Sequence, residues 1–560
     1  MKQNSADLKK LFNEKKYSEI INIIENKISK KDRNSGLLNL LGVCRLLEKN
    51  NASTLYLAIK DFRESYLKEK NTPNAFHALK NFINASMDLF DYEFRSNEKN
   101  LSKGSFDEIF LYFNENKEHF EKDKELTKSI IRVFKRYLDI DRTIFYLKKI
   151  IDNNQSDIDA LSSYIYFNNF RNDWSQEVFL KYSKILNDRL KTFSEAEIVD
   201  LKKSENNKIN LAFLSSDIRA KHSITSFLKT VLINYDKEKF NITLYVNNKE
   251  DETTKEFEKY VYKLKNISKM NDIDAINLIR SDRIDIIVDL MGFTSNHRLT
   301  LLKNRVAHKQ VLWCGYCNTS GIKEVDYLVS DKNLVYKEEE NLYSEKIIFL
   351  NDIWNCHSGF LGERKFNPAP SIINKHVTFG SFNNFRKIND KVIEVWSYIL
   401  KQIPNSKLIL KTSDASSTSQ IIEKFKKNNV ISSIQFEHHK KSLEKHLDDY
   451  KKIDIALDTF PYNGVTTSFE AIWMGVPTIT MKGYNFNSRC GESINKNIGL
   501  DNLIAQNEKD YVEKAKLYAL ETSKLSELRS IIHDKALKSP LFDTKRFAND
   551  FFTSLEKIYN

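Results

Sequence analysis

The chain has 560 residues, too many for one hydrophobic core, and this length favours about three or four domains. Hydrophobic residues make up 41% of it, enough for a core in each domain, but no apolar run approaches the roughly 20 residues of a membrane-spanning helix. The formal net charge of +12 arises from 88 basic residues interleaved with 76 acidic ones, and without an arginine-rich arm it does not indicate a nucleic-acid partner.

The first residues and the cysteines both predict a cytoplasmic protein. Residues 1–7 turn polar at once and lack the apolar segment of a secretory signal. Five cysteines, scattered from Cys44 to Cys490, are too few for a disulfide framework and agree with a reducing compartment.

Glycine usage divides the chain near residue 200. Only three of the 14 glycines precede that point, and the other eleven lie between Gly292 and Gly499. Because glycine serves tight turns and close backbone approach, we predict a helical domain over residues 1–200, followed by a loop-bearing α/β region.

The helical domain reads as helix pairs with polar turns. The spacing of one pair loosely fits a tetratricopeptide (TPR) repeat, at Leu41, Gly42, Ala58, Phe62 and Pro73. An unrelated helical bundle would place apolar residues at similar intervals. Stacked pairs leave a concave face that suits extended peptides, so we expect a TPR-like protein-interaction domain.

From Lys208 onward, short apolar runs alternate with helical stretches. This βαβ rhythm predicts parallel sheets with ligand chemistry at the carboxyl ends of the strands. We expect one Rossmann-like half over residues 205–365 and a second over 375–560, whose last helix, 544–559, crosses back to the first half. The expected strands are 209–214, 240–246, 284–290 and 310–313, then 377–379, 407–410, 434–436, 453–457 and 478–481.

The most informative stretch is residues 458–470, where a strand ends at Leu457, a turn follows and a helix begins at the threonines. Helix N-termini carry free N–H groups and partial positive charge, so they bind diphosphates without a metal. The pattern Thr467-x-x-Glu470 is also that of a capping box, which starts a helix and needs no ligand. Taken alone, the stretch leaves both interpretations open.

Six ordered motifs resemble the protein O-linked N-acetylglucosamine transferase family, glycosyltransferase family 41, and especially its bacterial members. The resemblance covers roughly residues 205 to 560. It implies a GT-B fold: two Rossmann-like domains facing a cleft, preceded by the TPR-like helical domain. The motifs are residues 214–223, 289–294, 313–331, 381–388, 458–480 and 539–545.

The resemblance assigns the donor-binding residues to the second half. It implies that Lys387 contacts the donor diphosphate, which suits a leaving group that gathers negative charge. Thr466 and Thr467 would bind phosphate oxygens, Glu470 the ribose, and His446 would pack near the uridine. Asn384, in the motif of Lys387, is counted with these donor-binding residues. The alternatives are a solvated surface lysine and a structural histidine.

The catalytic residues implied by the resemblance are His222, Asp217 and Lys387. Asp217 and His222 follow a strand of the first half, and either could orient the acceptor hydroxyl or remove its proton. Residues 219–221 place His222 one position further from Asp217 than the family pattern has it. A bulged loop would restore the position, or His222 would only shape the acceptor site.

Two other patterns are set aside. Trp313-Cys314-Gly315-Tyr316-Cys317 copies a thioredoxin-type active site, but the residues after it fit the transferase motif. The Asp-x-Asp pattern of metal-dependent transferases occurs at residues 139–141, 157–159 and 272–274, all outside the motif-bearing strands. No Cys/His cluster has zinc spacing, so we expect no metal or other cofactor.

The function expected from the sequence is inverting, metal-independent transfer of N-acetylglucosamine from UDP-GlcNAc, or a related UDP-sugar, to Ser or Thr of a protein. Flagellin or another surface protein is a plausible acceptor. One alternative is a UDP-glucose-dependent enzyme that glucosylates asparagine. The other is a non-catalytic TPR-type binding scaffold. The choice of sugar rests on the family analogy.

Overall fold

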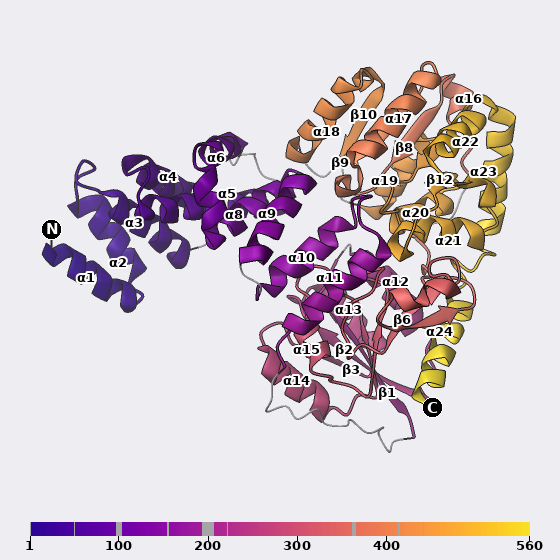
Figure 1. Ribbon diagram of the computed structural model, residues 1–560, viewed down its shortest axis with the longest axis horizontal. Helices are drawn as coiled ribbons and strands as arrows, with labels where there is room; N and C mark the ends of the chain where they lie inside the picture. The colour runs from indigo at the N-terminus through magenta and orange to yellow at the C-terminus, as the bar shows by residue number, and fades with distance from the viewer. Residues whose placement is uncertain are drawn as a thin grey trace. The chain divides into compact units, whose positions relative to one another are not determined.

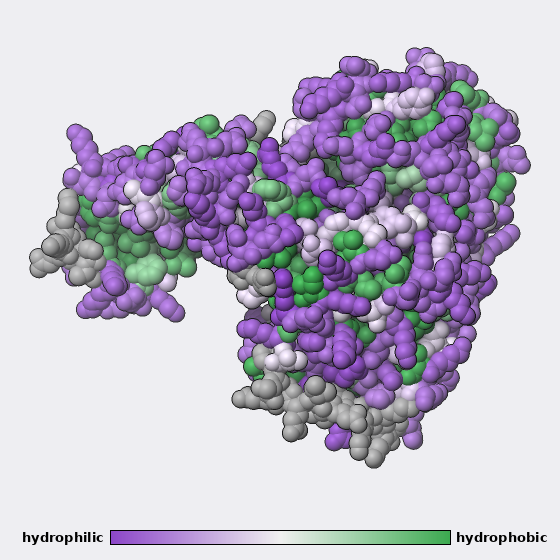
Figure 2. Space-filling view, in the orientation of Figure 1, coloured by the Kyte–Doolittle hydropathy of each residue, from purple (hydrophilic) through white to green (hydrophobic). Residues whose placement is uncertain are grey.

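The computed structural model describes residues 2–49, 51–96, 103–153, 156–192, 207–220, 222–360, 366–412, 415–438, 440 and 442–560. They form two compact units, Met1–Asn154 and Gln155–Asn560. The expected domain boundary near residue 200 lies in residues 193–206, outside the described part of the chain. Most of the surface in view is hydrophilic (Figure 2), and no helix in the ranges given above is long and apolar enough to cross a membrane.

The described residues of the first unit form helices without strands. Helices α3 and α4 approach closely, because a Cβ added to Gly42 would lie 2.6 Å from the ring of Phe62. Asn34 and Asn51 accept hydrogen bonds that start these two helices. The helices are α1 (Lys2–Asn13), α2 (Tyr17–Asn22), the π-helix η1 (Ile23–Lys27), α3 (Ser35–Glu48), α4 (Ala52–Lys68), α5 (Pro73–Ser96), α6 (Lys103–Glu115), α7 (Lys117–Lys122), α8 (Lys124–Arg136) and α9 (Ile140–Asn153).

The second unit begins with two helices, α10 and α11 (Figure 1). A seven-stranded parallel sheet of order β3-β2-β1-β4-β5-β6-β7 follows. Its central strands are almost entirely buried, as expected for a parallel sheet covered on both faces. The strands are β1 (Ile209–Ser215), β2 (Phe240–Val246), β3 (Lys263–Asn266), β4 (Ile286–Asp289), β5 (Lys309–Leu312), β6 (Tyr327–Asp331) and β7 (Lys346–Leu350). The helices are α10 (Ile158–Asn168), α11 (Gln176–Arg189), α12 (Ser223–Leu232), α13 (Glu252–Phe257), η2 (Glu258–Tyr260), α14 (Asp272–Ser281), α15 (Leu299–Lys303) and η3 (Lys337–Leu342).

A six-stranded parallel sheet of order β10-β9-β8-β11-β12-β13 forms the second half, which confirms the predicted pair of Rossmann-like halves. The strands are β8 (Thr378–Ser381), β9 (Lys407–Thr412), β10 (Ile434–His438), β11 (Ile455–Leu457), β12 (Thr478–Met481) and β13 (Ile504–Ala505). The helices are α16 (Ser371–Asn374), η4 (Phe385–Lys387), α17 (Asp390–Gln402), α18 (Ala415–Lys427), η5 (Ile431–Ser433), α19 (Leu443–Asp448), η6 (Asp449–Lys452), α20 (Thr466–Trp473), η7 (Phe486–Ser488), α21 (Cys490–Asn497), η8 (Asp501–Leu503), α22 (Glu508–Leu520), α23 (Thr522–Ala536) and α24 (Thr544–Tyr559).

The last helix, α24, packs on the first sheet, as the sequence predicted (Figure 1). The ring of Phe551 lies 4.6 Å from that of Trp313 and 6.4 Å from that of Phe213, centroid to centroid. Arg546 of α24 also pairs at 2.7 Å with Asp352, which lies just after β7. Helix α24 therefore joins the end of the second half to the core of the first.

Helix α11 and the loop that precedes it contact loops of both halves. Gln176 of α11 donates to the Asn318 side chain at 2.7 Å and accepts from Asn485 at 3.1 Å. The ring of Phe170 stacks on that of Tyr462 with centroids 5.2 Å apart. The two halves thus share a buried polar and aromatic contact with the segment that precedes them.

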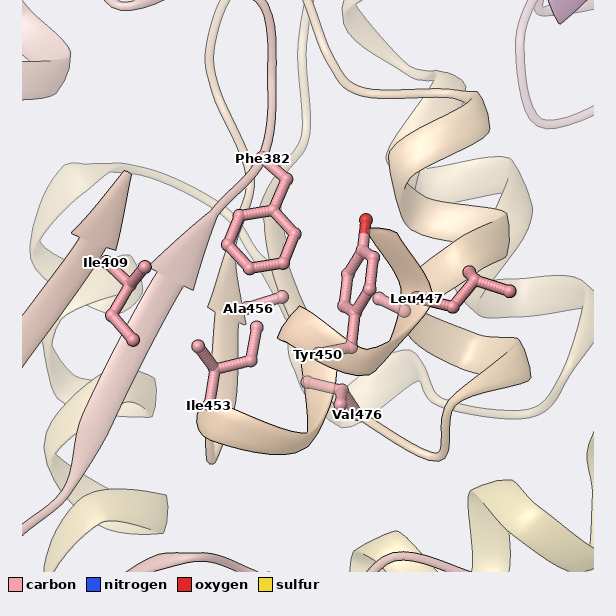
Figure 3. Packing of buried hydrophobic residues seen from close by; sticks show 8 residues of the cluster. Phe382, Ile409, Leu447, Tyr450, Ile453, Ala456 and Val476 are labelled. Atoms are coloured by element: carbon pink, nitrogen blue, oxygen red, sulfur yellow. The ribbon is translucent and has the colours of Figure 1, made fainter. Parts of the chain in front are cut away.

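A hydrophobic cluster supports the second sheet beside helix α20. Figure 3 shows the rings of Phe382 and Tyr450 side by side, and their centroids are 4.6 Å apart. The remaining members are Ile409, Leu447, Ile453, Ala456, Ala471 and Val476, all buried. Phe382 directly follows β8, and Tyr450 lies in η6, which follows α19. This cluster therefore fixes the segment that leads from β8 to Lys387 and the end of α19, the helix that contains His446.

Candidate functional site

The candidate residues follow the carboxyl ends of four parallel strands, β1, β8, β10 and β11, and His446 in α19 is the one that follows β10. The ring of Phe227 in α12 lies 5.5 Å from the ring of Phe469 in α20. Since α12 begins at Ser223 and α20 at Thr466, the two helix starts belong to packed helices from opposite halves. Such strand ends are where open α/β sheets bind ligands.

Asp458 organises the loop between β11 and α20. One of its carboxylate oxygens accepts from the backbone N–H of Gly464 at 2.7 Å and of Thr459 at 2.9 Å. The other accepts from the hydroxyl of Thr480 at 2.8 Å. Burial raises the pKa of Asp458 to about 6, against the lowering effect of these donors. The carboxylate is a structural anchor that fixes where α20 begins.

The start of α20 is not a capping box. Its N-cap is Val465, and no side chain caps it. Thr467 lies within the helix and donates its hydroxyl to the Asn383 side chain at 3.0 Å, while Glu470 accepts from other residues. In the described part of the chain, the backbone N–H groups of Thr466 and Thr467 have no acceptor. This helix start is therefore free to bind an anion.

Lys387 lies against this loop. Its ammonium donates to the carbonyl oxygen of Asn463 at 2.7 Å and lies 4.3 Å from the centroid of the Tyr462 ring. Burial lowers the pKa of Lys387, and the charge of Asp458 opposes that shift. An ammonium has three N–H donors, and the described residues accept one hydrogen bond from Lys387, at the carbonyl of Asn463 just before α20. Lys387 can therefore donate to a ligand bound at the start of this helix.

The two asparagines of this motif have different roles. Asn384 is exposed, and its side chain accepts from the backbone N–H of Arg386 at 3.0 Å, which starts the short helix carrying Lys387. Asn383 is buried, receives the Thr467 hydroxyl and lies 3.4 Å from Asp458. Sequence reasoning missed Asn383, although it stands beside Asn384 in the quoted motif.

His446 and Glu470 are joined directly. The ring Nε2 of His446 lies 3.0 Å from Oε2 of Glu470, and the hydroxyl of Tyr450 donates to the same oxygen at 2.7 Å. The ring Nδ1 of His446 faces the ammonium of Lys411 at 2.6 Å. The predicted uridine and ribose residues thus form one hydrogen-bonded group, whose members Tyr450 and Lys411 the sequence did not indicate.

Asp217 and His222 are also brought together. Oδ1 of Asp217 lies 3.4 Å from Nε2 of His222 and 3.3 Å from the guanidinium of Arg219. Burial lowers the pKa of His222, while the charge of Asp217 opposes this shift. Because Lys221 lies outside the described residues, the bulged loop that would restore the family position of His222 stays a prediction. A neutral imidazole beside a carboxylate can accept a proton.

Tyr166 of α10 is a residue that sequence analysis did not single out. Burial raises the pKa of its hydroxyl, the charge of Arg386 lowers it and that of Asp217 raises it. Tyr166 therefore lies near charged residues from both halves. It belongs to a segment ahead of the recognised motifs, and no sequence signal marked it.

The two patterns that the sequence set aside have structural explanations. Cys314 lies in a turn with φ of +74° and not at the start of a helix, and burial raises the pKa of its thiol well above the ordinary value. The three Asp-x-Asp segments lie at the starts of α9, α10 and α14. Across the ranges that the structure describes, no group of three or more His, Cys, Asp or Glu side chains could hold a metal ion.

Comparison with known proteins identifies one family. The model of glycosyl transferase family 41 matches residues 176–366 and 368–551. A probable UDP-N-acetylglucosamine–peptide N-acetylglucosaminyltransferase of Solanum lycopersicum, SPINDLY, is 34% identical over 350 residues, 60% of this chain and 37% of that protein. A protein of Arabidopsis thaliana with the same description, SEC, is 26% identical over 373 residues, 63% of this chain and 37% of that protein. The matches span less than half the length of these relatives.

The fold has a solved counterpart. A structure of a Thermobaculum terrenum O-GlcNAc transferase mutant matches 94% of this chain and 98% of its own, with a TM-score of 0.78 and 20% sequence identity. This match shows the same fold, including the helical region ahead of the two sheets.

Proposed function

The chain belongs to glycosyltransferase family 41, as its motifs indicated, and we propose that it transfers N-acetylglucosamine from UDP-GlcNAc to Ser or Thr of a protein, with inversion and without a metal. The observation that carries this proposal is the uncapped start of α20 beside the ammonium of Lys387. Both features stabilise the negative charge that collects on a departing nucleoside diphosphate.

The donor would bind along the second half. Its phosphates would accept from the N–H groups of Thr466 and Thr467 and from Lys387, and its ribose would meet Glu470. Because a fixed ammonium and a helix start supply the positive charge, no step requires a metal ion. Asn384 would assist by holding the turn that carries Lys387, through its hydrogen bond to Arg386.

The acceptor would be activated from the first half. His222 is the candidate base, because burial keeps its pKa low and Asp217 lies 3.4 Å away to stabilise the imidazolium that forms. Attack on the face of the sugar opposite the diphosphate would invert the configuration at the anomeric carbon.

The helical unit Met1–Asn154 would present the polypeptide acceptor. The close packing of α3 and α4 at Gly42 supports a stack of TPR-like helix pairs. The five cysteines are free, four of them buried, which supports a reducing, cytoplasmic location. An acceptor such as flagellin or another surface protein would then be modified before export.

The test is intact-mass measurement of candidate acceptors, flagellin included, with a panel of UDP- and GDP-sugars and excess chelator. We expect an added mass of one N-acetylhexosamine with UDP-GlcNAc, unchanged by chelator and removed by alkaline β-elimination. Transfer of glucose to asparagine, stable to alkali, would support the N-linked alternative. Activity lost with chelator would contradict the metal-free mechanism, and no added mass with any donor would favour the binding scaffold.

A further inference from the structure

Lys411, in strand β9, is a fully buried cation near the candidate site. Its side chain has 0% exposure and its ammonium pairs with Oδ2 of Asp449 at 2.7 Å. Burying a lysine costs free energy unless all of its N–H groups find acceptors. Desolvation lowers the pKa of Lys411, and the hydrogen bond and charge of Asp449 oppose this shift.

The Lys411 ammonium makes its other hydrogen-bonding contacts, among the described residues, with His446. The ammonium lies 2.6 Å from Nδ1 of His446 and 3.3 Å from its backbone oxygen. Asp449 alone would leave the other N–H groups of the buried ammonium without acceptors, and His446 supplies them. The contact with the imidazole links Lys411 to the group that also includes Glu470.

The direction of these hydrogen bonds follows from the chemistry of an ammonium. It donates and cannot accept, so Nδ1 of His446 is the acceptor and the ring hydrogen resides on Nε2. Nε2–H then donates to Oε2 of Glu470 at 3.0 Å. The Tyr450 hydroxyl donates to the same oxygen at 2.7 Å. Oε2 thus has two donors, whereas among the described residues no hydrogen bond reaches the other carboxylate oxygen of Glu470, which can accept from a ligand.

We propose that Lys411 is a positioning residue of the nucleotide-sugar site, which fixes the Nε2–H tautomer of His446 and so holds Glu470 in place for the donor. The proposal rests on the proposed function, because it assumes that His446 and Glu470 meet the nucleoside. Lys411 itself, fully buried, would not touch the donor.

The first experiment measures the tautomer in the wild-type protein. Selective ¹⁵N-histidine labelling and long-range ¹⁵N–¹H correlation, with His446→Gln to assign the signal, distinguish a protonated Nε2 from a protonated Nδ1. We expect the hydrogen on Nε2. A hydrogen on Nδ1 would overturn the proposal, whether or not the protein transfers a sugar.

The second experiment compares Lys411→Met with a matched control, Asp449→Asn. Methionine keeps the length of the side chain and removes every donor, while asparagine keeps an acceptor for Lys411 and leaves its contact with His446. We expect Lys411→Met to raise KM for the nucleotide sugar and Kd for UDP about tenfold, the range of a hydrogen bond to a charged group, with a smaller change in kcat. Asp449→Asn should change melting temperature more than KM. Equal effects of both variants on stability, with KM unchanged, would make Lys411 purely structural.

A double-mutant cycle separates an action through His446 from a direct one. If Lys411 acts through the imidazole, Lys411→Met should add little to the Kd of His446→Ala for UDP. Additive effects would overturn the proposed route. Since Kd is measured with UDP alone, a protein that binds UDP but transfers no sugar would contradict the proposed function and still test Lys411. If no nucleotide binds, the proposed function fails and the tautomer measurement remains.

Discussion

Gly464→Ala tests the start of α20 with the smallest change that the chain allows. A Cβ at this position would lie 2.4 Å from the hydroxyl oxygen of Thr467 and 2.7 Å from Oδ1 of Asn383, the two atoms that share a hydrogen bond of 3.0 Å. Such overpacking costs about 1–3 kcal/mol, and the broken hydrogen bond about 1 kcal/mol more. We expect a local penalty of about 2–4 kcal/mol, centred on the residues proposed to hold the diphosphate.

Gly475→Ala is the matched control at the other end of the same helix. Gly475 has φ of +73°, but the nearest atom to an added Cβ is the backbone oxygen of Arg529 at 3.8 Å. Alanine there costs about 1–2 kcal/mol of backbone strain and meets no steric clash. Both variants should melt earlier than the wild type, and only one of them alters the candidate phosphate site.

The assay is UDP binding by calorimetry, together with KM for the nucleotide sugar. We expect Gly464→Ala to weaken UDP binding by at least tenfold and Gly475→Ala to leave it within about twofold, since 1.4 kcal/mol corresponds to a factor of ten. Wild-type affinity in a folded Gly464→Ala protein would refute the placement of the diphosphate at this helix start.

Three further outcomes follow from the geometry. Lys387→Met should lower kcat about 100-fold or more without lowering the melting temperature, and unchanged turnover would show that its ammonium does not stabilise the leaving group. Asp217→Asn removes a charge that raises the pKa of His222, so the acid limb of the pH profile of kcat/KM should move to lower pH; a shift to higher pH would exclude His222 as the base. Phe551→Ala should destabilise the protein by about 3–5 kcal/mol, read as an early melting transition, because its ring is 1% exposed and packs on Trp313.

The sequence predicted the elements that have strong periodic patterns. Strand β1 and helix α24 lie close to where the apolar runs placed them, because buried parallel strands and amphipathic helices leave clear signals. Strand β3, Lys263–Asn266, was missed because it is an edge strand with two lysines and little burial. Strand β7, Lys346–Leu350, was also missed, although its apolar run could have indicated it.

The sequence likewise predicted some of the candidate-site residues and left the roles of others open. Lys387 in η4 and Thr467 in α20 could be named from the sequence because the family motifs contain them. The role of Asn384 could not be separated from that of Asn383, since neighbouring positions differ only in which one the turn buries. Whether Thr467 capped its helix was equally undetermined, because a capping box and a phosphate-binding start share one pattern.

What the sequence could not supply is the set of pairings between motifs. Asn383 meets Thr467 across 84 residues, and Lys387 meets the Asn463 carbonyl across 76. A parallel sheet brings such distant segments together at one edge, and no local pattern records which partner each side chain finds there. Lys411 is the clearest case, because a lysine within an apolar strand reads as an irregularity until its contact with His446 is seen. The residues most informative about mechanism are therefore those whose partners lie in another motif, and substitutions at these contacts test the proposed function more sharply than substitutions within one motif.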